Sequence, residues 1–196
     1  MFLALAANGW LHSNSLYYIA GSGDLLISIP EQDWVVKIGY KGGKGTGNVL
    51  WRLGEGGDFQ AKSDDPYPWF SFQHDVGFDP PGSNRLVLFD DGHRRKDKYP
   101  KANNRGQVWE LDEEHHIATL AINADVGVYA VAVGSAQSLS NGGYSFESGF
   151  INPGPSVFSR ATEVSPAGKV VYAQQLDGTL TYRSFRVPDL YTAPRK

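Results

Sequence analysis

The stretch FSFQHDVGFDPPGSNRLVLFD, residues 70–90, contains two apolar segments separated by a turn rich in proline and glycine. The first segment is aromatic and holds one histidine, His74, and the second is aliphatic. Aromatic and aliphatic runs on both sides of such a turn are typical of two neighbouring β-strands. The stretch therefore predicts an antiparallel strand pair that keeps a titratable ring in its first strand.

This strand pair is the first half of a unit that occurs three times. Aligning WLHSNSLYY (10–18), SFQHDVGFD (71–79) and VGSAQSLSN (133–141) places His12, His74 and Gln137 at one position, 62 and 63 residues apart (74 − 12 and 137 − 74). Each unit continues with a third strand (WVVKIGY, GQVWELD, RATEVSP) and a fourth (NVLWRLG, HIATLAIN, KVVYAQQL). Four short antiparallel strands repeated in this way are typical of the blades of a β-propeller.

The predicted fold class is therefore all-β, with a single partial β-propeller domain over 1–196. Its blades are expected at about 11–54, 73–123 and 136–176, with a closing segment at 180–191. Propellers have four to eight blades, so three cannot close a ring. We expect either further N-terminal blades or self-association of two copies to complete it.

Composition excludes several classes of function. The 196 residues carry a net charge of −3, which argues against a nucleic-acid-binding surface. Cysteine is absent, so disulfides and thiolate metal sites are excluded. No apolar run approaches the roughly 20 residues of a membrane span. The start, MFLALAANGW, lacks a basic region and is interpreted as the beginning of a strand rather than a signal peptide.

Two motifs that resemble ligand sites have simpler explanations. The glycine-rich KGGKGTGN (41–48) precedes a strand rather than a helix and is interpreted as a hairpin turn, not a phosphate loop. His115 and His116 are adjacent in an extended chain, so they point to opposite faces and are poor joint metal ligands. No carboxylate or cysteine shows zinc spacing, and the sequence predicts no metal and no cofactor.

The repeat itself suggests a site. First strands of propeller blades line the central channel, so His12 and His74 are expected to converge there. Arg94 and Arg95 follow the second strand of the middle unit in FDDGHRR. Arginine can bind a tetrahedral oxyanion bidentately, and histidine can act as nucleophile, acid or base near neutral pH. Together they predict a pocket for a phosphate or sulfate ester.

At these residues the sequence resembles the arylsulfate sulfotransferases, the PAPS-independent aryl sulfotransferase family. The matching stretches include GWLHSNS, NVLWRLGEGGDF, WFSFQHDV, LVLFDDGHRR and YRSFRVPDLY, and they span nearly the whole chain. The resemblance implies the C-terminal half of a six-bladed propeller. It also implies transfer of a sulfuryl group from a phenolic sulfate to a phenol, through a sulfohistidine. An exported or periplasmic location would fit the family, but the sequence does not determine the compartment.

The resemblance also implies roles for particular residues. His12, His74 and Arg95 correspond to catalytic positions, with Arg94 as the alternative arginine. The family's nucleophilic histidine in the following blade has no counterpart, because no histidine follows His116 and the matching region reads GGYSFESGF, with Ser145. Glu31 stands where the family often has a histidine.

Structural alternatives stay open for each of these residues. His12 could be a channel histidine bonded to backbone, and Arg95 a solvated loop charge, with His93 a weaker site residue in the same turn. Asp90 could orient a site histidine or bond nearby amides. The tryptophans are expected to pack between blades, although Trp10 and Trp69 could stack on a phenol. The sequence thus predicts an aryl sulfotransferase acting on small phenolic partners, or a propeller that keeps the pocket and binds an aromatic or oxyanion ligand without turnover.

Overall fold

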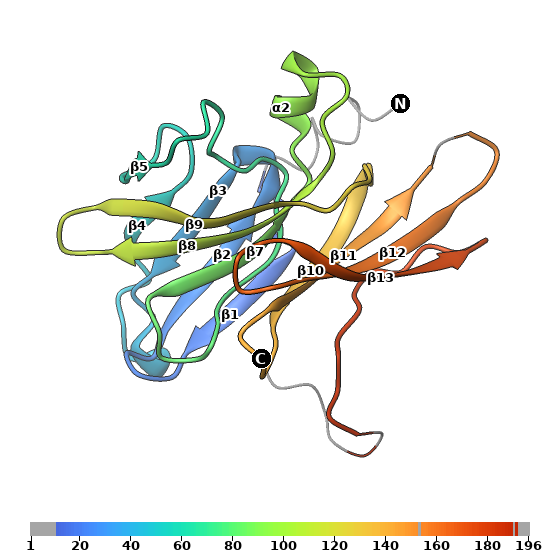
Figure 1. Ribbon diagram of the computed structural model, residues 1–196. Coiled ribbons are helices and arrows are strands. Elements are labelled where there is room, and N and C mark those ends of the chain that lie inside the picture. Colours follow the sequence, from blue (N-terminus) through green and yellow to red (C-terminus); the bar gives the residue numbers. More distant parts are fainter. Residues whose placement is uncertain (1–10, 153, 190, 192–196) are drawn as a thin grey trace.

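Three antiparallel β-sheets make up the chain, arranged side by side (Figure 1). The computed structural model describes residues 11–152, 154–189 and 191, so Trp10 lies outside the described residues. The first sheet contains β1 (Ser15–Ile19), β2 (Asp24–Ile29), β3 (Trp34–Ile38) and β4 (Val49–Leu53), in that order. Two short 3-10 turns, η1 (Pro30–Gln32) and η2 (Lys41–Gly43), connect its strands.

The other two sheets repeat this plan. The second contains β6 (His74–Phe78), β7 (Arg85–Asp90), β8 (Arg105–Asp112) and β9 (Ile117–Asp125), and the short β5 (Gln60–Lys62) joins it parallel to β9. The third contains β10 (Ala132–Ser138), β11 (Tyr144–Ile151), β12 (Phe158–Val164) and β13 (Val170–Asp177). One short helix, α2 (His93–Lys98), follows β7.

The first strands of the three sheets are neighbours. β6 contacts β1 on one side and β10 on the other. The backbone N–H of Val76 donates to Ser15 Oγ at 3.1 Å, and that of Ala136 donates to Asp75 Oδ2 at 3.0 Å. Side chains of β1 and β6 therefore accept hydrogen bonds from the backbone of β6 and β10, respectively.

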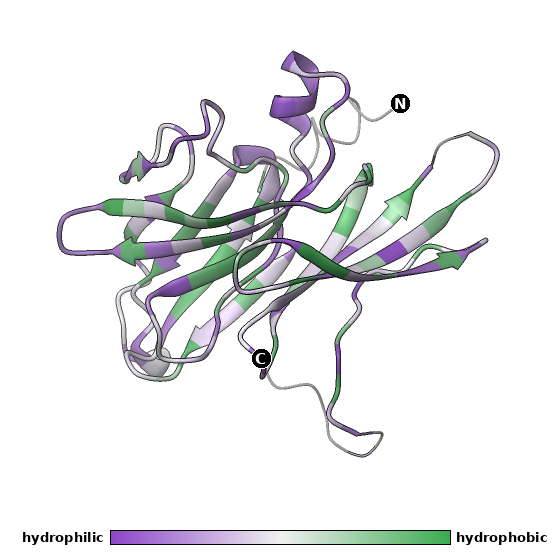
Figure 2. Ribbon diagram, viewed as in Figure 1, coloured by the Kyte–Doolittle hydropathy of each residue, from purple (hydrophilic) through white to green (hydrophobic). Residues whose placement is uncertain are grey.

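The second sheet is the middle layer, with a hydrophobic core on each face. One core lies against the first sheet and includes Leu26, Trp51 and Trp109; the other lies against the third sheet and includes Phe89 and Phe146. Residues 86–89, LVLF, are all buried, which explains why this strand is continuously apolar rather than alternating. Figure 2 shows the same apolar run along β7.

Glycine allows the second and third sheets to approach closely. A Cβ atom on Gly106 would lie 2.1 Å from the Phe146 ring, and one on Gly134 would lie 2.3 Å from the Phe89 ring. Any other residue at either position would push the two sheets apart. The glycine excess of the sequence thus includes packing positions as well as turns.

The predicted all-β class and the antiparallel sheets of four short strands are confirmed. The sheets do not close into a ring, so a complete propeller is not formed by the described residues. None of the helices in the described part of the chain has the length and apolar character needed to span a bilayer.

The predicted register of the repeat is wrong. His74 is the first residue of β6, whereas Gln137 is the last but one of β10 and His12 precedes β1 by three residues. Asp75 and Val133, each second in its strand, share a left-handed backbone, with φ of 55° and 58°. His12, His74 and Gln137 therefore do not share one strand position.

Candidate active site

His74 is buried where the second sheet meets its neighbours. Its side chain is 10% exposed, and its Nδ1 lies 3.2 Å from Asp91 Oδ2 and 3.1 Å from the backbone oxygen of Phe72. Phe72 and Asp75 both have positive φ, and the pairing of β6 with β7 shifts register between His74 and Gly77. Such a bulge redirects the side chains around it, and here it marks the start of β6.

Asp91 provides the carboxylate partner of this ring. Its side chain is 1% exposed, and burial raises the pKa of its carboxyl while the nearby His74 ring lowers it. Asp91 Oδ1 has no hydrogen-bond partner. An imidazole whose Nδ1 faces a buried carboxylate and a carbonyl keeps its hydrogen on that nitrogen, so Nε2 carries the lone pair. The two residues, named here the His74 pair, have the arrangement of a histidine nucleophile or base with its orienting acid.

Asp90, the residue that the sequence suggested as an orienter, is engaged elsewhere. Its Oδ1 accepts from the backbone N–H of Ser71 at 2.9 Å, and its Oδ2 accepts from Arg105 Nε at 2.8 Å. Arg105 also bonds Asp65 at 3.0 Å. Asp90, Arg105 and Asp65 are called the Arg105 cluster here. Their charges pair with one another and not with the His74 ring. Asp91, and not Asp90, is therefore the carboxylate that lies next to His74 Nδ1.

The two arginines of the basic turn point in different directions. Arg94 Nε donates to Asp33 Oδ2 at 2.9 Å, its guanidinium lies 5.5 Å from the centre of the Phe72 ring, and its side chain is 55% exposed. Arg95 is 12% exposed, lies 3.9 Å from Asp90 Oδ2 and donates to the backbone oxygen of Asn103. Burial lowers the pKa of Arg95, whereas the Asp33 contact raises that of Arg94. Arg94 is thus the arginine that solvent, and a charged ligand, can reach.

His12 lies at the same end of the sheets but is exposed. Its Nδ1 lies 2.7 Å from Glu31 Oε1, and its side chain is 53% exposed. Asn14, two residues on, donates from Nδ2 to the backbone oxygen of Gln73 at 2.7 Å, which connects the start of β1 to the residue before His74. The two histidines therefore share one end of the molecule, although each has its own carboxylate.

The other residues that the sequence singled out have partners elsewhere in the structure. Trp69 stacks on Trp109 with ring centres 4.9 Å apart. His93 stacks on Phe72 at 4.4 Å and bonds the backbone oxygen of Val131. His115 pairs with Asp112 in the turn after β8. In the portion of the chain that the structure describes, no group of three or more His, Asp or Glu side chains could hold a metal ion.

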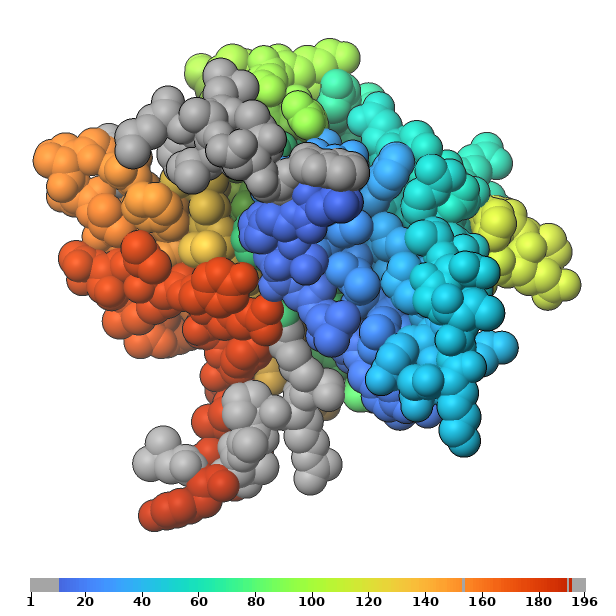
Figure 3. Space-filling model, turned by 180° about the vertical axis from the view of Figure 1, so that it is seen from behind, coloured from blue at the N-terminus to red at the C-terminus, as the bar shows by residue number. Residues whose placement is uncertain are grey.

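The sequence did not single out two residues that contact His74, namely Asp91 and Tyr182. The acidic doublet in FDDGHRR was a signal for Asp91, but it could not say which carboxylate faces the ring. Tyr182 lies edge-on to His74 with ring centres 6.4 Å apart. It belongs to the C-terminal tail, residues 178–189, which Figure 3 shows in red against the blue start of the first sheet. The residues around Tyr182 in the sequence form no pattern that predicts this contact.

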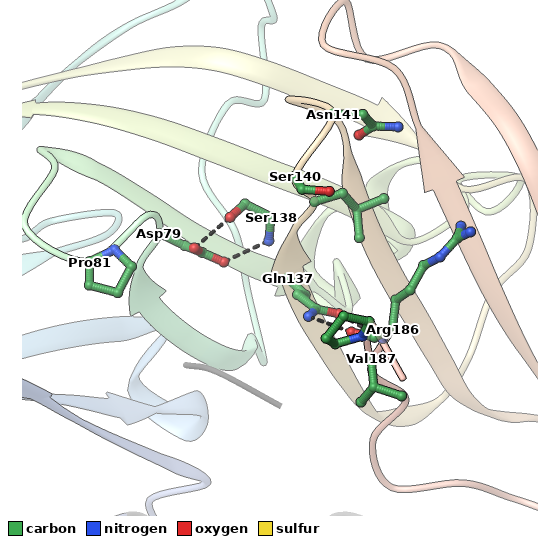
Figure 4. A pocket seen from close by; sticks show the side chains of 10 residues that line it. Asp79, Pro81, Gln137, Ser138, Ser140, Asn141, Arg186 and Val187 are labelled. Carbon is green, nitrogen blue, oxygen red and sulfur yellow. Dashed lines mark hydrogen bonds between the residues drawn. The ribbon is translucent and has the colours of Figure 1, made fainter. Parts of the chain in front are cut away.

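Two open clefts lie away from His74. One, of about 650 Å³, is formed by Asp79, the end of β10 and the tail residues 186–188, and Figure 4 shows Asp79 bonded to Ser138 in its wall. The other, of about 940 Å³, lies over β1 and the turn at 81–84. Both are at the opposite end of the first strands from the His74 pair.

A comparison with known families places these features in context. The profile of the arylsulfotransferase (ASST) family matches residues 2–183, which is most of the chain. The chain belongs to the arylsulfotransferase family. The predicted resemblance is thereby confirmed, and no curated protein matches the chain. For an arylsulfotransferase, the His74 pair and the exposed Arg94 are the described groups whose chemistry fits a sulfate ester most directly.

Proposed function

We propose that this chain carries the acid–base part of a site that transfers a sulfuryl group from a phenolic sulfate ester to a phenol. The observation that carries the proposal is the buried contact between His74 Nδ1 and Asp91 Oδ2, at 3.2 Å. Family membership supports the reaction class. The geometry supports the choice of His74 over the four other histidines of the sequence.

In the proposed reaction, His74 Nε2 removes the proton of the acceptor phenol. The phenol oxygen attacks sulfur, a new S–O bond forms, and the S–O bond to the donor breaks. The donor leaves as a phenolate, which takes up the proton held by His74. Arg94, whose guanidinium is exposed, binds the sulfate oxygens. Asp91 keeps the His74 hydrogen on Nδ1 and stabilises the imidazolium.

A chromogenic aryl sulfate with a phenol acceptor tests this proposal. His74→Gln should lower kcat about 10²- to 10⁴-fold, the range expected for loss of an acid–base group. His115→Gln is the matched control, because His115 is 65% exposed in the turn after β8 and should leave kcat unchanged. Equal activity of the His74→Gln variant and the wild type would refute the role of His74.

A second candidate function is binding of an aromatic sulfate without turnover. It is favoured by the third sheet, which contains no histidine, so the nucleophilic histidine that the family resemblance implies has no counterpart there. The binding function predicts that an aryl sulfate raises the melting temperature but is recovered unchanged. Release of the donor phenol that depends on the acceptor would instead support sulfuryl transfer. A labile sulfuryl adduct on His74 would instead indicate that His74 attacks sulfur itself.

A further inference from the structure

The C-terminal tail returns from the third sheet to the start of the first. Thr181 donates from its backbone N–H to Gly149 at 3.1 Å, and Ser184 and Ser135 bond each other. The tail then contacts the residue before β1: Arg183 Nη2 donates to the backbone oxygen of Asn14 at 3.1 Å. This last contact joins residues that are 169 positions apart in the chain.

Arg183 also contacts the residue that follows His74. Its Nη1 lies 3.4 Å from Asp75 Oδ1, and the Asp75 side chain is fully buried. The other carboxylate oxygen of Asp75 accepts from the backbone N–H of Ala136 at 3.0 Å. Asp75 has φ of 55°, a conformation that costs an L-residue free energy unless its surroundings hold it. Arg183 and Ala136 provide that support.

The residue that precedes His74 is held from the other side. Asn14 Nδ2 donates to the backbone oxygen of Gln73 at 2.7 Å, and Ser28 Oγ donates to the same oxygen at 3.3 Å. The contacts therefore form a closed loop, from Asn14 to Gln73, along the chain to Asp75, to Arg183, and back to Asn14. His74 lies on this loop, between Gln73 and Asp75. The Tyr182 ring lies edge-on to it, 6.4 Å away between centres.

We propose that Arg183 is a positioning residue for His74, and that the tail acts as a clamp that fixes the imidazole against Asp91. The catalytic consequence rests on the proposed function. The positioning itself does not, because it concerns only where the ring lies. Arg183 does not need to touch the substrate. It holds the strained backbone at Asp75, and a small displacement there would move the ring relative to Asp91 and to any bound ester.

The experiment compares Arg183→Met, Arg183→Lys and Arg186→Met. Methionine keeps part of the apolar stem of arginine but removes both contacts, and lysine restores one positive charge next to Asp75. Arg186 is the matched control in the same tail. Its side chain is 64% exposed and pairs with Glu163 at the far side of the third sheet. Melting temperature and circular dichroism establish that each variant is folded.

The first readout is independent of activity. In ¹⁵N NMR of the substrate-free protein, the His74 ring should show its hydrogen on Nδ1 in the wild type and in Arg186→Met. In Arg183→Met the ring signals should shift toward a mixture of tautomers, and Arg183→Lys should restore them in part. The second readout is kcat, which should fall about tenfold to a hundredfold in Arg183→Met, with KM changed less than about twofold.

The outcomes separate the two proposals. Shifted ring signals with no turnover in any form, including the wild type, would support the clamp and sink the transfer reaction. Unchanged His74 signals in a folded Arg183→Met variant would overturn the clamp, whatever the activity. A fall in melting temperature without any change in ring signals or kcat would likewise overturn it, since Arg183 would then only stabilise the fold.

Discussion

Asp90 and Asp91 are consecutive residues that belong to two different clusters of buried charge. In the Arg105 cluster, both oxygens of Asp90 are hydrogen-bonded, one to a backbone N–H and one to an arginine that is itself 5% exposed. In the His74 pair, one Asp91 oxygen faces the imidazole and the other has no partner. The first arrangement is fully satisfied and supports the fold. The second leaves one buried carboxylate oxygen without a hydrogen bond, and burial raises the pKa of Asp91.

The arginines divide in the same way. Arg95 is buried near Asp90 and Arg105, whereas Arg94 keeps an exposed guanidinium above the Phe72 ring. One turn of chain thus supplies one buried arginine and one arginine that solvent reaches. The comparison teaches that a conspicuous charged motif should be divided residue by residue, by burial and satisfied bonds, before roles are assigned.

The largest expected effect is on the structural side. Arg105→Met should lower the free energy of unfolding by about 3–5 kcal/mol, because buried Asp90 would lose the arginine that is hydrogen-bonded to it. Arg85→Met is the control in the same sheet. Arg85 pairs with Glu110 where both side chains are partly exposed, so its loss should cost at most about 1 kcal/mol. Urea unfolding of both variants measures the difference, and equal losses would erase the distinction between buried and exposed pairs.

The second effect is expected on turnover rather than on stability. Asp91→Asn should lower kcat about a hundredfold, since the amide cannot stabilise the imidazolium. It should not destabilise the fold as the Arg105 variant does.

The pH dependence of Asp91→Asn follows from linkage. The folded pKa of Asp91 is raised above 3.8, so the folded state binds this proton more tightly than the unfolded state. The wild type therefore loses stability from this group as the pH rises above about 4, and the variant does not. Unfolding curves at several pH values should show the variant gaining on the wild type as the pH rises. A constant difference would contradict the assignment of a raised pKa.

The smallest expected effect compares the two arginines directly. Arg94→Ala should raise the KM for an aryl sulfate about tenfold, with a loss of stability below about 1 kcal/mol, because the residue is exposed. Arg95→Ala should cost about 1–3 kcal/mol of stability, because the backbone oxygen of Asn103 loses the hydrogen bond that Arg95 donates, with KM nearly unchanged. Steady-state kinetics and unfolding of both variants provide the measurement. The reverse pattern would return the anion-binding role to Arg95, the residue that the family resemblance favoured.

The sequence by itself determined the strands, the grouping into three four-stranded units and the family. These features depend on local information: alternation, apolar runs and turn residues act over a few positions. His74 could be identified as a candidate site residue for the same reason, since a single histidine inside an aromatic strand is visible from its neighbours in the sequence. The register of the repeat could not, because His74 starts β6 whereas Gln137 lies near the end of β10 and His12 precedes β1.

Tertiary structure alone decided which member of each doublet faces the site. Adjacent residues at the end of a strand point to opposite sides, so Asp90 and Asp91 are separated by the geometry of the backbone and not by their chemistry. It also decided the contacts on which the proposed clamp rests. Arg183 and Tyr182 reach Asn14 across 169 and 168 positions of sequence, and such pairs come together only when the three sheets have packed side by side.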